Sequence, residues 1–581
     1  MSEHKPGDKA KIGVYICHCG GNISDTIDVK RVAAVLAEYR NVEISREYPF
    51  MCSDAGQKMV IEDIESGRNN RVVIAACSPM LHELTFRKTL ERADLNPYLY
   101  EHVNIREQTS WVHKADHEGA TEKAIRLARA GVEKILRQDE LESIQVDATK
   151  HVLVIGGGPA GIKAALDSAG RGLRVTLVEK SNLLGGHLHD LDTLYPSGEK
   201  ASDLLANLLA KIKATPMITV ALETTVTGWD GFVGNFSATL SDGTVLKAGA
   251  VILATGYDHV IPADGEYEYG KDARVTTLPK LIEHMKSNVG TPLVWNGKPV
   301  KSVAFIHCVG SRQTEGVHVP QADGKVNDYC SRVCCTAALH TINAIKAKQP
   351  ELNIYDCYRD IRTYGRGHEE IYTQASKNGV VFLRFNGDAQ PEIKPASVVV
   401  KDILTWGQEV EVPADLVVLV TGVKQGAVEE LVSMMKLPVS ADRFLQEAHP
   451  KLRPVEVANN GFYLAGNCQA PMDLVESAAA AGAASSKIAA LLSKDYIPLD
   501  PYVARVDSDK CTGCEACLTE CSYTGAIFQN PATKKAEVNA ALCKGCGACV
   551  AVCEPRALDL AGWSIDQMEA MVDAMAAEVL P

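Results

Sequence analysis

The 581-residue chain lacks any long apolar run. No window approaches the roughly 18 apolar residues that cross a bilayer, and the N-terminal residues contain no apolar segment of signal-peptide length. Positive charge is also scarce, because 60 Lys and Arg face 73 Asp and Glu, a net charge of -13. That balance argues against nonspecific nucleic-acid binding and against an anionic membrane surface. We therefore expect a cytoplasmic protein with no nucleic-acid partner and no direct membrane span.

Cysteine is abundant, but a disulfide framework is not expected, because reducing compartments keep thiols reduced. The eighteen cysteines fall into groups, which indicates metal–sulfur chemistry instead. The groups are Cys17, Cys19, Cys52 and Cys77; Cys308, Cys330, Cys334 and Cys335; the separate Cys357 and Cys468; and eight cysteines between 511 and 553.

A dinucleotide motif lies in the stretch from His151 to Glu179. An apolar run, His151–Ile155, leads into a G-x-G-x-x-G turn, a helical segment and a second strand that ends on an acid. The glycines allow a tight turn, close approach of the backbone to a pyrophosphate, and packing of helix on strand, while the acid accepts hydrogen bonds from ribose hydroxyls. The alternative is a glycine-rich turn in an ordinary α/β sheet. The predicted cofactor-binding residues here are Gly156, Gly158, Pro159, Ala160, Gly161 and Glu179.

Three later motifs indicate that this dinucleotide is FAD. Lys180, Gly186 and His187 follow the acid and are predicted to lie close to the cofactor. Thr255 and Gly256 end a buried strand in A-T-G, which resembles the second signature of two-dinucleotide-binding flavoproteins. Gly466 and Asn467 resemble the last flavin signature, in which an acid normally stands where this chain has Asn467.

A second glycine turn for a nicotinamide dinucleotide is missing. The corresponding strand, Ser302–Ile306, runs into Cys308, where close approach to a pyrophosphate is not expected. Cys334 and Cys335 precede a predicted helix, Thr336–Lys346, and a helix N-terminus favours thiolate over thiol. We predict a 4Fe–4S cluster on Cys308, Cys330, Cys334 and Cys335. A redox disulfide or a group of buried thiols are the alternatives.

A further cluster is predicted in the N-terminal residues. Strands expected at Lys11–Ile16, Glu43–Tyr48 and Arg71–Ala75 end next to cysteines, and ligands collect at that edge of open α/β sheets. Four thiolates can hold one 4Fe–4S cluster. The predicted ligands are Cys17, Cys19, Cys52 and Cys77, with buried structural thiols as the alternative.

The strongest pattern is a C-x-x-C-x-x-C-x-x-x-C run that occurs twice near the C-terminus. It is typical of two-cluster bacterial ferredoxins, in which the fourth cysteine of each run binds the other cluster. Zinc sites rarely contain two such runs. One predicted cluster is held by Cys511, Cys514, Cys517 and Cys553, and the other by Cys543, Cys546, Cys549 and Cys521.

Two cysteines and the C-terminal tail fall outside these groups. Cys357 is expected to be a buried structural thiol, whereas Cys468 lies beside the flavin motif and its role stays open between a structural thiol and a group that tunes the redox site. The tail has a capping-box pattern at Ser564 and apolar residues on one helical face. That face is expected to pack on the ferredoxin domain or to dock a partner protein.

In combination and in order, these motifs resemble the family of heterodisulfide reductase A-subunits. The resemblance rests on Cys17-His18-Cys19-Gly20, the stretch 75–79, the stretch 104–113, the glycine turn, Cys330-x-x-x-Cys334-Cys335 and the double ferredoxin run. It implies FAD, several 4Fe–4S clusters, a homodimeric hub of a larger complex, and electron bifurcation toward a high-potential acceptor and ferredoxin. Longer family members carry an extra ferredoxin insert, but this chain has no cysteine between Glu179 and Cys308.

The predicted fold class is α/β: a two-dinucleotide-binding, thioredoxin-reductase-like flavoprotein with an N-terminal α/β iron–sulfur domain and a C-terminal α+β ferredoxin domain. The expected domains are 1–150 (iron–sulfur domain and linker helices), 151–297 (FAD domain, first part), 298–400 (second nucleotide-binding-like domain with cysteines), 401–497 (FAD domain, return part), 501–562 (two 4Fe–4S ferredoxin) and 563–581 (amphipathic helix).

The predicted function is electron transfer within a heterodisulfide-reductase-like complex. Electron pairs would come from a hydrogenase, a formate dehydrogenase or an NADH-oxidising module, and single electrons would leave to disulfide reductase and iron–sulfur subunits or to ferredoxin. The cofactors carry the chemistry, so no catalytic side chain is assigned. Two alternatives are a non-bifurcating conduit in a sulfur-metabolism or quinone-linked complex and a self-contained NAD(P)H oxidoreductase.

Overall fold

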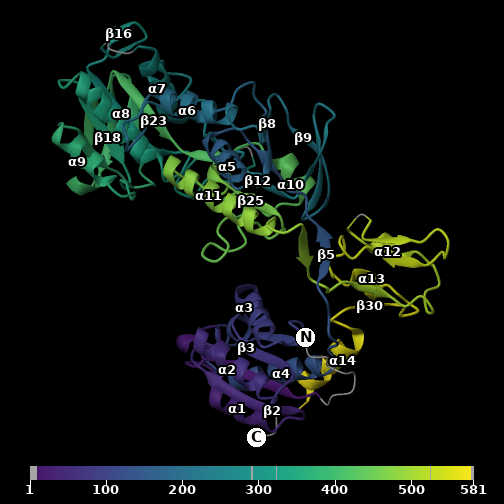
Figure 1. The fold of residues 1–581 in the computed structure, drawn as a ribbon. Coiled ribbons are helices and arrows are strands. Elements are labelled where there is room, and N and C mark those ends of the chain that lie inside the picture. Colours follow the sequence, from purple (N-terminus) through teal and green to yellow (C-terminus); the bar gives the residue numbers. More distant parts are fainter. Residues whose placement is uncertain (1–9, 289–291, 322, 524, 578–581) are drawn as a thin grey trace. The chain divides into compact units, whose positions relative to one another are not determined.

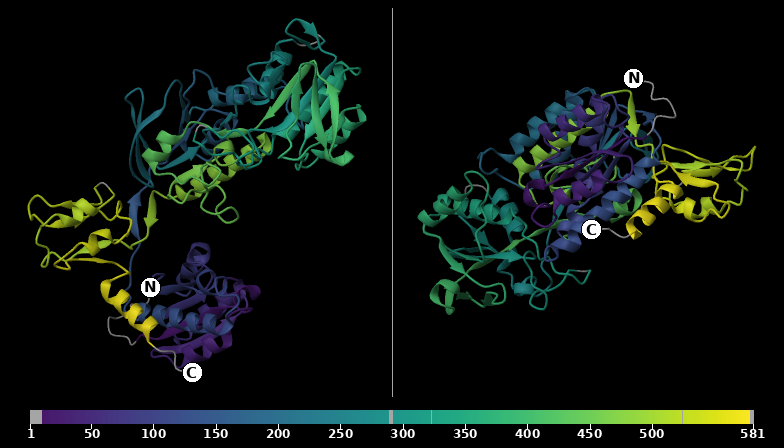
Figure 2. Two further views of the ribbon diagram at one scale, coloured as in Figure 1. Left: turned by 180° about the vertical axis from the view of Figure 1, so that it is seen from behind. Right: turned by 90° about the horizontal axis from the view of Figure 1, so that it is seen from below.

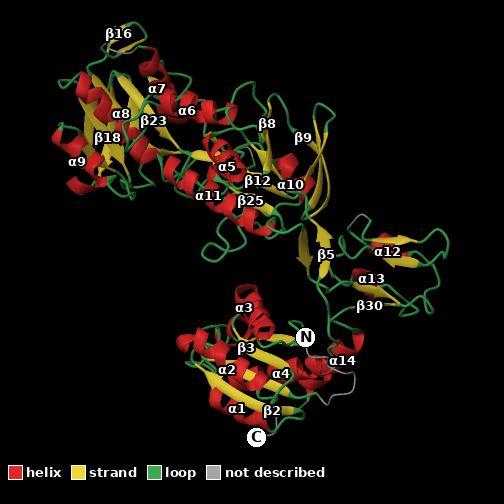
Figure 3. Ribbon diagram, in the orientation of Figure 1, coloured by secondary structure: helices red, strands yellow, loops and turns green. Residues whose placement is uncertain are grey.

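The computed structural model describes residues 10–288, 292–321, 323–523 and 525–577. The chain forms two compact units, one made of Met1–Val146 together with Pro498–Pro581 and the other of Asp147–Ile497. Figure 1 labels their elements, and Figure 3 shows that both units mix helices with strands. The last residues of the expected tail, 578–581, lie outside the described residues. None of the described helices is long and apolar enough to cross a membrane.

The N-terminal part of the first unit is a four-stranded parallel sheet in the order β2-β1-β3-β4. β1 and β3 are apolar and almost fully buried, as expected for central parallel strands that are covered on both faces. The order reverses between β1 and β3, the place where open α/β sheets bind ligands. The strands are β1 (Ile12–Cys17), β2 (Val42–Tyr48), β3 (Arg71–Ala76) and β4 (Tyr100–Asn104), and the helices are α1 (Val29–Ala37), α2 (Asp54–Glu65), α3 (Pro79–Arg92) and α4 (His117–Leu136).

The C-terminal part of the first unit consists of two short antiparallel pairs and two short helices. Its core is small and includes Cys517 and Cys549. The pairs are β27 (Ala504–Val506) with β30 (Leu558–Leu560) and β28 (Ile527–Gln529) with β29 (Ala536–Val538), and the helices are α12 (Ala516–Glu520) and α13 (Ala548–Ala551).

The tail helix α14 (Ile565–Ala576) packs against α4, as Figures 1 and 2 also show. Its capping box at Ser564 is formed as predicted. The packing face differs from the expected one, because the buried side chains are Gln567, Ala570 and Ala574, whereas Met568 is 53% exposed. Small side chains let the two helices approach closely, and the Gln567 amide donates to Gln138 at 2.8 Å. The helix therefore packs on the N-terminal domain through small residues and leaves Met568 and Val572 exposed.

The second unit contains two five-stranded parallel sheets, β25-β12-β6-β7-β8 and β14-β23-β17-β18-β19. Each sheet contains three strands that are consecutive neighbours, and a later strand crosses back to lie beside the first of the three. This duplication confirms the two-dinucleotide-binding fold. The strands are β6 (His151–Ile155), β7 (Arg174–Val178), β8 (Ile218–Ala221), β12 (Ala250–Leu253) and β25 (Phe462–Leu464), then β14 (Val275–Thr277), β17 (Ser302–Val309), β18 (Asn353–Tyr358), β19 (Val381–Arg384) and β23 (Leu416–Thr421).

Antiparallel segments and helices complete this unit. In each half, a three-stranded meander lies between the third parallel strand and the strand that crosses back. A short ribbon of β13 (Tyr257–His259) with β24 (Val423–Gln425) joins the two crossover points. The meanders are β9 (Val226–Phe232), β10 (Asn235–Leu240) and β11 (Val245–Ala248), and β20 (Glu392–Lys394), β21 (Ser397–Asp402) and β22 (Gln408–Pro413). The helices are α5 (Pro159–Gly170), α6 (Ala201–Lys213), α7 (Leu278–Ser287), α8 (Cys334–Lys348), α9 (Glu369–Lys377), α10 (Glu429–Met435) and α11 (Leu474–Leu491).

Two glycines of the turn after β6 have separate steric roles. Gly156 has φ +109°, and a Cβ there would overlap the carbonyl oxygen of Ala254 on the neighbouring strand. Gly161 lies in the first turns of α5, where a Cβ would overlap the carbonyl oxygen of Gly156. The helix can therefore pack this closely on the strand only without a side chain at Gly161.

This packing predicts opposite effects for two substitutions in α5. Gly161→Ala should lower stability by about 1–3 kcal/mol or more, because the added methyl group must displace backbone. Gly170→Ala in the same helix meets nothing within 4 Å and should raise stability by up to about 0.5–1 kcal/mol through helix propensity. Thermal unfolding of the two variants measures the difference, and equal melting temperatures would contradict the steric role of Gly161.

Candidate cofactor sites

The glycine turn after β6 leaves room for a phosphate group. A Cβ on Gly158 or on Gly256 would have no atom within 4 Å, in contrast to Gly156 and Gly161. Gly158, Pro159 and Ala160 form the start of α5, where free N–H groups favour an anion. The Glu179 carboxylate at the end of β7 accepts the Gly157 N–H at 2.6 Å, so it points at this turn. The predicted dinucleotide residues thus come together at one sheet edge.

The loop after Glu179 closes over the same turn. The Gly185 N–H donates to the Gly157 carbonyl at 2.8 Å, and a Cβ on Gly186 would lie 3.2 Å from Gly158 Cα. His187 has hydrogen-bond partners at both ring nitrogens, Asp190 at 2.7 Å and the Tyr257 carbonyl at 3.0 Å. The Asp190 carboxylate raises the pKa of His187. Lys180 is exposed.

The last flavin motif packs against the start of α5. A Cβ on Gly466 would lie 2.8 Å from Ala160 Cβ, and the buried Asn467 accepts from Ser477 Oγ at 3.2 Å. Cys468 is fully buried and its thiol donates to the Leu253 carbonyl at 3.0 Å. Burial raises the pKa of Cys468 to about 11. Cys468 thus packs against the end of the strand that leads into A-T-G.

Unpaired polar groups mark the same region. Within the described part of the chain, Thr255 Oγ1, Thr421 Oγ1 and both amide atoms of Gln425 are buried without a hydrogen-bond partner. Buried polar atoms are normally paired, so these groups are available to bind a ligand. Gln425 is paired with Tyr257 across the β13–β24 ribbon, next to the A-T-G turn. Sequence reasoning missed Gln425, because no local motif marks it. The donors and the open glycine turn fit a flavin dinucleotide.

The second sheet carries cysteines where the first carries its glycine turn. Cys308 lies near the end of β17 with φ +63°, a conformation that is unusual for a residue other than glycine. Cys334 and Cys335 begin α8, and the Arg332 N–H contacts Cys330 Sγ at 3.4 Å. The hydrogen bond to Cys335, burial and the charges of Cys308 and Cys330 all raise the pKa of Cys334. The four predicted ligands therefore lie close enough to interact electrostatically.

A buried ion pair supports this group. His307 Nε2 lies 2.7 Å from Asp356 Oδ1, and the two side chains are 1% and 0% exposed. The other ring nitrogen of His307 lies 3.7 Å from Cys335 Sγ. Sequence reasoning missed both residues, since each lies within an apolar strand run. Cys357, next to Asp356, is fully buried in the core of the second sheet, as expected for a structural thiol.

The N-terminal cysteines gather where the strand order reverses. Cys17 ends β1, Cys77 follows β3, and the Cys19 N–H contacts Cys17 Sγ at 3.3 Å. The pKa of Cys77 is raised to about 12, first by burial and also by the charges of Cys19 and Cys17. Burial also raises the pKa of Cys52, an effect that the charge of Arg106 partly offsets. The Arg106 guanidinium donates to Cys19 Sγ at 3.0 Å. Arg106, which no spacing rule singled out, therefore brings a positive charge to Cys19, Cys52 and Cys77.

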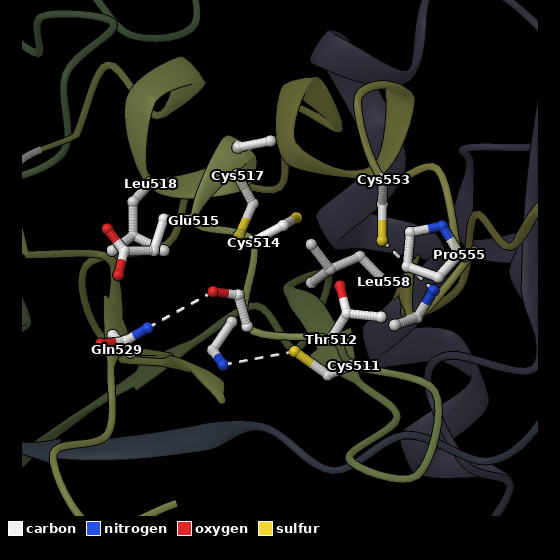
Figure 4. A pocket seen from close by; sticks show the side chains of 14 residues that line it. Cys511, Thr512, Cys514, Glu515, Cys517, Leu518, Gln529, Cys553, Pro555 and Leu558 are labelled. Carbon is white, nitrogen blue, oxygen red and sulfur yellow. Dashed lines mark hydrogen bonds between the residues drawn. The ribbon is translucent and has the colours of Figure 1, made fainter. Parts of the chain in front are cut away.

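The ferredoxin cysteines line two separate pockets. In the pocket of Figure 4 the side chains of Cys511, Cys514 and Cys517 face that of Cys553 from the second run. The other pocket combines Cys543, Cys546 and Cys549 with Cys521 from the first run. Backbone N–H groups contact the sulfurs, for example Ala557 to Cys553 at 3.2 Å and Ala536 to Cys511 at 3.5 Å. The chain thus brings together the crossed sets that the spacing predicts.

None of these groups has the geometry of a site for one ion. Among the described residues, no three Cys, His, Asp or Glu side chains converge on a point as the ligands of a single metal ion do. In a 4Fe–4S cluster each thiolate binds a different iron, so the ligand sulfurs lie further apart. Four cysteines around an open pocket are consistent with that chemistry.

Two family models match parts of this chain. Residues 150–289 match the family model "Pyridine nucleotide-disulphide oxidoreductase", and residues 504–554 match "4Fe-4S dicluster domain". A solved thioredoxin reductase from Lactococcus lactis, 18% identical, covers 58% of this chain and 97% of its own, but the TM-score of 0.40 is too low to support an argument.

Two relatives match nearly end to end. The second iron–sulfur A-subunit of the CoB–CoM heterodisulfide reductase of Methanopyrus kandleri is 36% identical over 91% of this chain and 92% of its own. The A-subunit of the H2:CoB–CoM heterodisulfide,ferredoxin reductase of Methanothermobacter marburgensis is 35% identical over 99% of both chains. The chain, a flavin and 4Fe–4S oxidoreductase, therefore belongs to the family of heterodisulfide reductase A-subunits.

Proposed function

We propose that this chain distributes electrons within a heterodisulfide-reductase-like complex, using one FAD and four 4Fe–4S clusters. The observation that carries the proposal is the crossed lining of the two ferredoxin pockets, because a fourth cysteine from the other run is the arrangement of a two-cluster electron carrier. FAD supplies exchange between electron pairs and single electrons, which iron–sulfur clusters carry one at a time.

The side chains have separate binding roles in this proposal. The turn at Gly156–Gly161 holds the pyrophosphate and Glu179 the ribose, while the unpaired Thr255 and Gln425 are available to the flavin. The cluster ligands are Cys17, Cys19, Cys52 and Cys77; Cys308, Cys330, Cys334 and Cys335; Cys511, Cys514, Cys517 and Cys553; and Cys521, Cys543, Cys546 and Cys549. Arg106 offsets negative charge at the N-terminal cluster, and the burial of Cys17 and Cys77 limits the access of water to it.

The names of the relatives support a class of partners. One relative is named for H2, the CoB–CoM heterodisulfide and ferredoxin, and another, from Methanococcus maripaludis, for H2 or formate as well. We infer that this chain receives electron pairs from a hydrogenase, formate dehydrogenase or NADH-oxidising module. Its electrons leave to disulfide reductase and iron–sulfur subunits or to ferredoxin, and the chain acts as a homodimer.

A non-bifurcating conduit is the second candidate function, and one observation favours it. The alignment with the M. marburgensis relative runs over 672 positions, more than the 581 residues of this chain, so that relative contains segments with no counterpart here. Between Glu179 and Cys308 this chain has no cysteine for an inserted ferredoxin. A chain with fewer low-potential clusters has fewer routes by which one electron of a pair can reach ferredoxin. A self-contained NAD(P)H oxidoreductase is less well supported, because Cys308 stands at the turn that would bind the nicotinamide dinucleotide.

Paired substitutions test the crossed ligand sets. Cys511→Ser with Cys553→Ser removes two ligands of one cluster and should lower the iron content by about four atoms per chain. Cys543→Ser with Cys553→Ser removes one ligand from each cluster and should lower it by about eight. Iron analysis with electron paramagnetic resonance of the reduced protein measures both losses.

Cys357→Ala is the matched control, because this buried thiol lies in the core and outside every proposed ligand set. It should keep the iron content unchanged. The reverse pattern, with the larger loss in the Cys511 and Cys553 pair, would contradict the crossed assignment.

Ferredoxin reduction by the purified complex separates the two candidate functions. A bifurcating complex should reduce ferredoxin only while a high-potential disulfide acceptor is also present, because the favourable transfer drives the unfavourable one. A plain conduit should reduce either acceptor alone at the potential of its donor. Spectrophotometric assays with each acceptor separately and with both together measure this dependence.

A further inference from the structure

Arg332 connects the cysteine loop of the second sheet to the helix that follows the last flavin motif. It lies between Cys330 and Cys334 and has φ +58°, an unusual backbone conformation for an arginine. Its side chain does not turn toward the cysteines. It extends to the start of α11, a helix that packs on α5 beside the glycine turn.

Three contacts hold the Arg332 guanidinium there. One nitrogen donates to the Pro471 carbonyl at 3.0 Å, and another forms an ion pair with Glu476 Oε1 at 2.8 Å. The ring of Tyr364 stacks on the guanidinium, 4.6 Å from its carbon to the ring centroid, and the Tyr364 hydroxyl donates to Glu476 Oε2 at 3.4 Å. Glu476 also closes the α11 capping box with Asp473, so the acceptor is itself fixed. Arginine suits this position because its planar guanidinium can pack on an aromatic ring and pair with a carboxylate at the same time.

A separate set of contacts joins the same two halves of this unit. Thr193 Oγ1, in the loop after Gly186, lies 2.9 Å from His340 Nε2 on α8. The Tyr195 hydroxyl donates to the Gly367 carbonyl at 2.7 Å, and the Tyr195 ring packs edge-on against His368. The Arg332 contacts and the contacts of Thr193 and Tyr195 lie at separate points. Together they resist rotation of the first-sheet domain against the second-sheet domain, whereas a single contact would allow it.

We propose that the Arg332–Glu476 ion pair is a clamp that holds the Cys330–Cys335 loop against the start of α11. The inference rests on the proposed function. With FAD at the first sheet and a cluster at the second, the clamp fixes the distance between the two cofactors, and the rate of electron transfer between bound cofactors falls steeply with distance. Arg332 and Glu476 are thus positioning residues for transfer between FAD and the cluster.

Glu476→Gln tests the clamp with little other change. An amide oxygen can replace the carboxylate oxygen in the capping box, so α11 keeps its N-terminal cap, but the charge that pairs with Arg332 is lost. Asp167→Asn is the control, because it removes the ion pair of Asp167 with Lys163, which lies within α5 and connects no second element. Both variants are measured as anaerobically loaded full-length protein.

Hydrogen exchange and rapid kinetics give two readouts. Backbone amides of 331–336 and 472–477 should exchange roughly two- to fivefold faster in Glu476→Gln, the factor expected for a partly exposed ion pair. The rate at which electrons leave reduced FAD for the cluster should also fall, with FAD content, iron content and midpoint potentials unchanged. Asp167→Asn should change none of these.

Unchanged exchange in Glu476→Gln, or faster exchange with an unchanged electron-transfer rate, would overturn the clamp. A shift in the midpoint potentials with no change in exchange would also overturn it, since the residue would then act by charge and not by position. These results are distinct from a failure of the proposed function, which the unaltered protein would show by lacking FAD or the second-sheet cluster.

Discussion

Crowding of buried cysteine thiols is the constraint on which the sites at Cys77 and Cys334 depend. A hydrogen bond to Cys335 and burial raise the pKa of Cys334, burial raises the pKa of Cys77, and neighbouring cysteine charges add to both shifts, so a bare thiolate is disfavoured at both positions. Positive charge and hydrogen-bond donors favour the charged form of a thiol, and the protein places Arg106 on Cys19 and backbone N–H groups on Cys553 and Cys511. Strand ends and tight turns then follow as the places where four such groups can meet.

The duplicated sheet gives this unit two turns at equivalent positions. Both sheets of the second unit contain the same crossover, and each presents a turn at the end of its central strand, β6 or β17. In the first sheet the turn is Gly156–Gly161, which admits a pyrophosphate, and in the second the corresponding position is Cys308. The two turns thus differ in their side chains, while the surrounding strand arrangement is the same.

Local patterns could be predicted from the sequence, and distant pairings could not. The glycine turn and the crossed ferredoxin sets depend on fixed short spacings, so their arrangement follows from sequence. Arg332 and Glu476 are 144 positions apart and no spacing rule connects them. The packing of α14 on α4 through Ala570 and Ala574 was also missed, because the larger apolar residues of α14 suggested a different packing face. Close approach of two helices instead favours small residues at the contact.

The iron and FAD content of anaerobically purified protein tests the central claim most directly. Four clusters and one flavin predict about sixteen iron atoms and one FAD per chain, since each 4Fe–4S cluster contains four irons. About eight irons per chain would contradict the account, because only the two ferredoxin clusters would then remain.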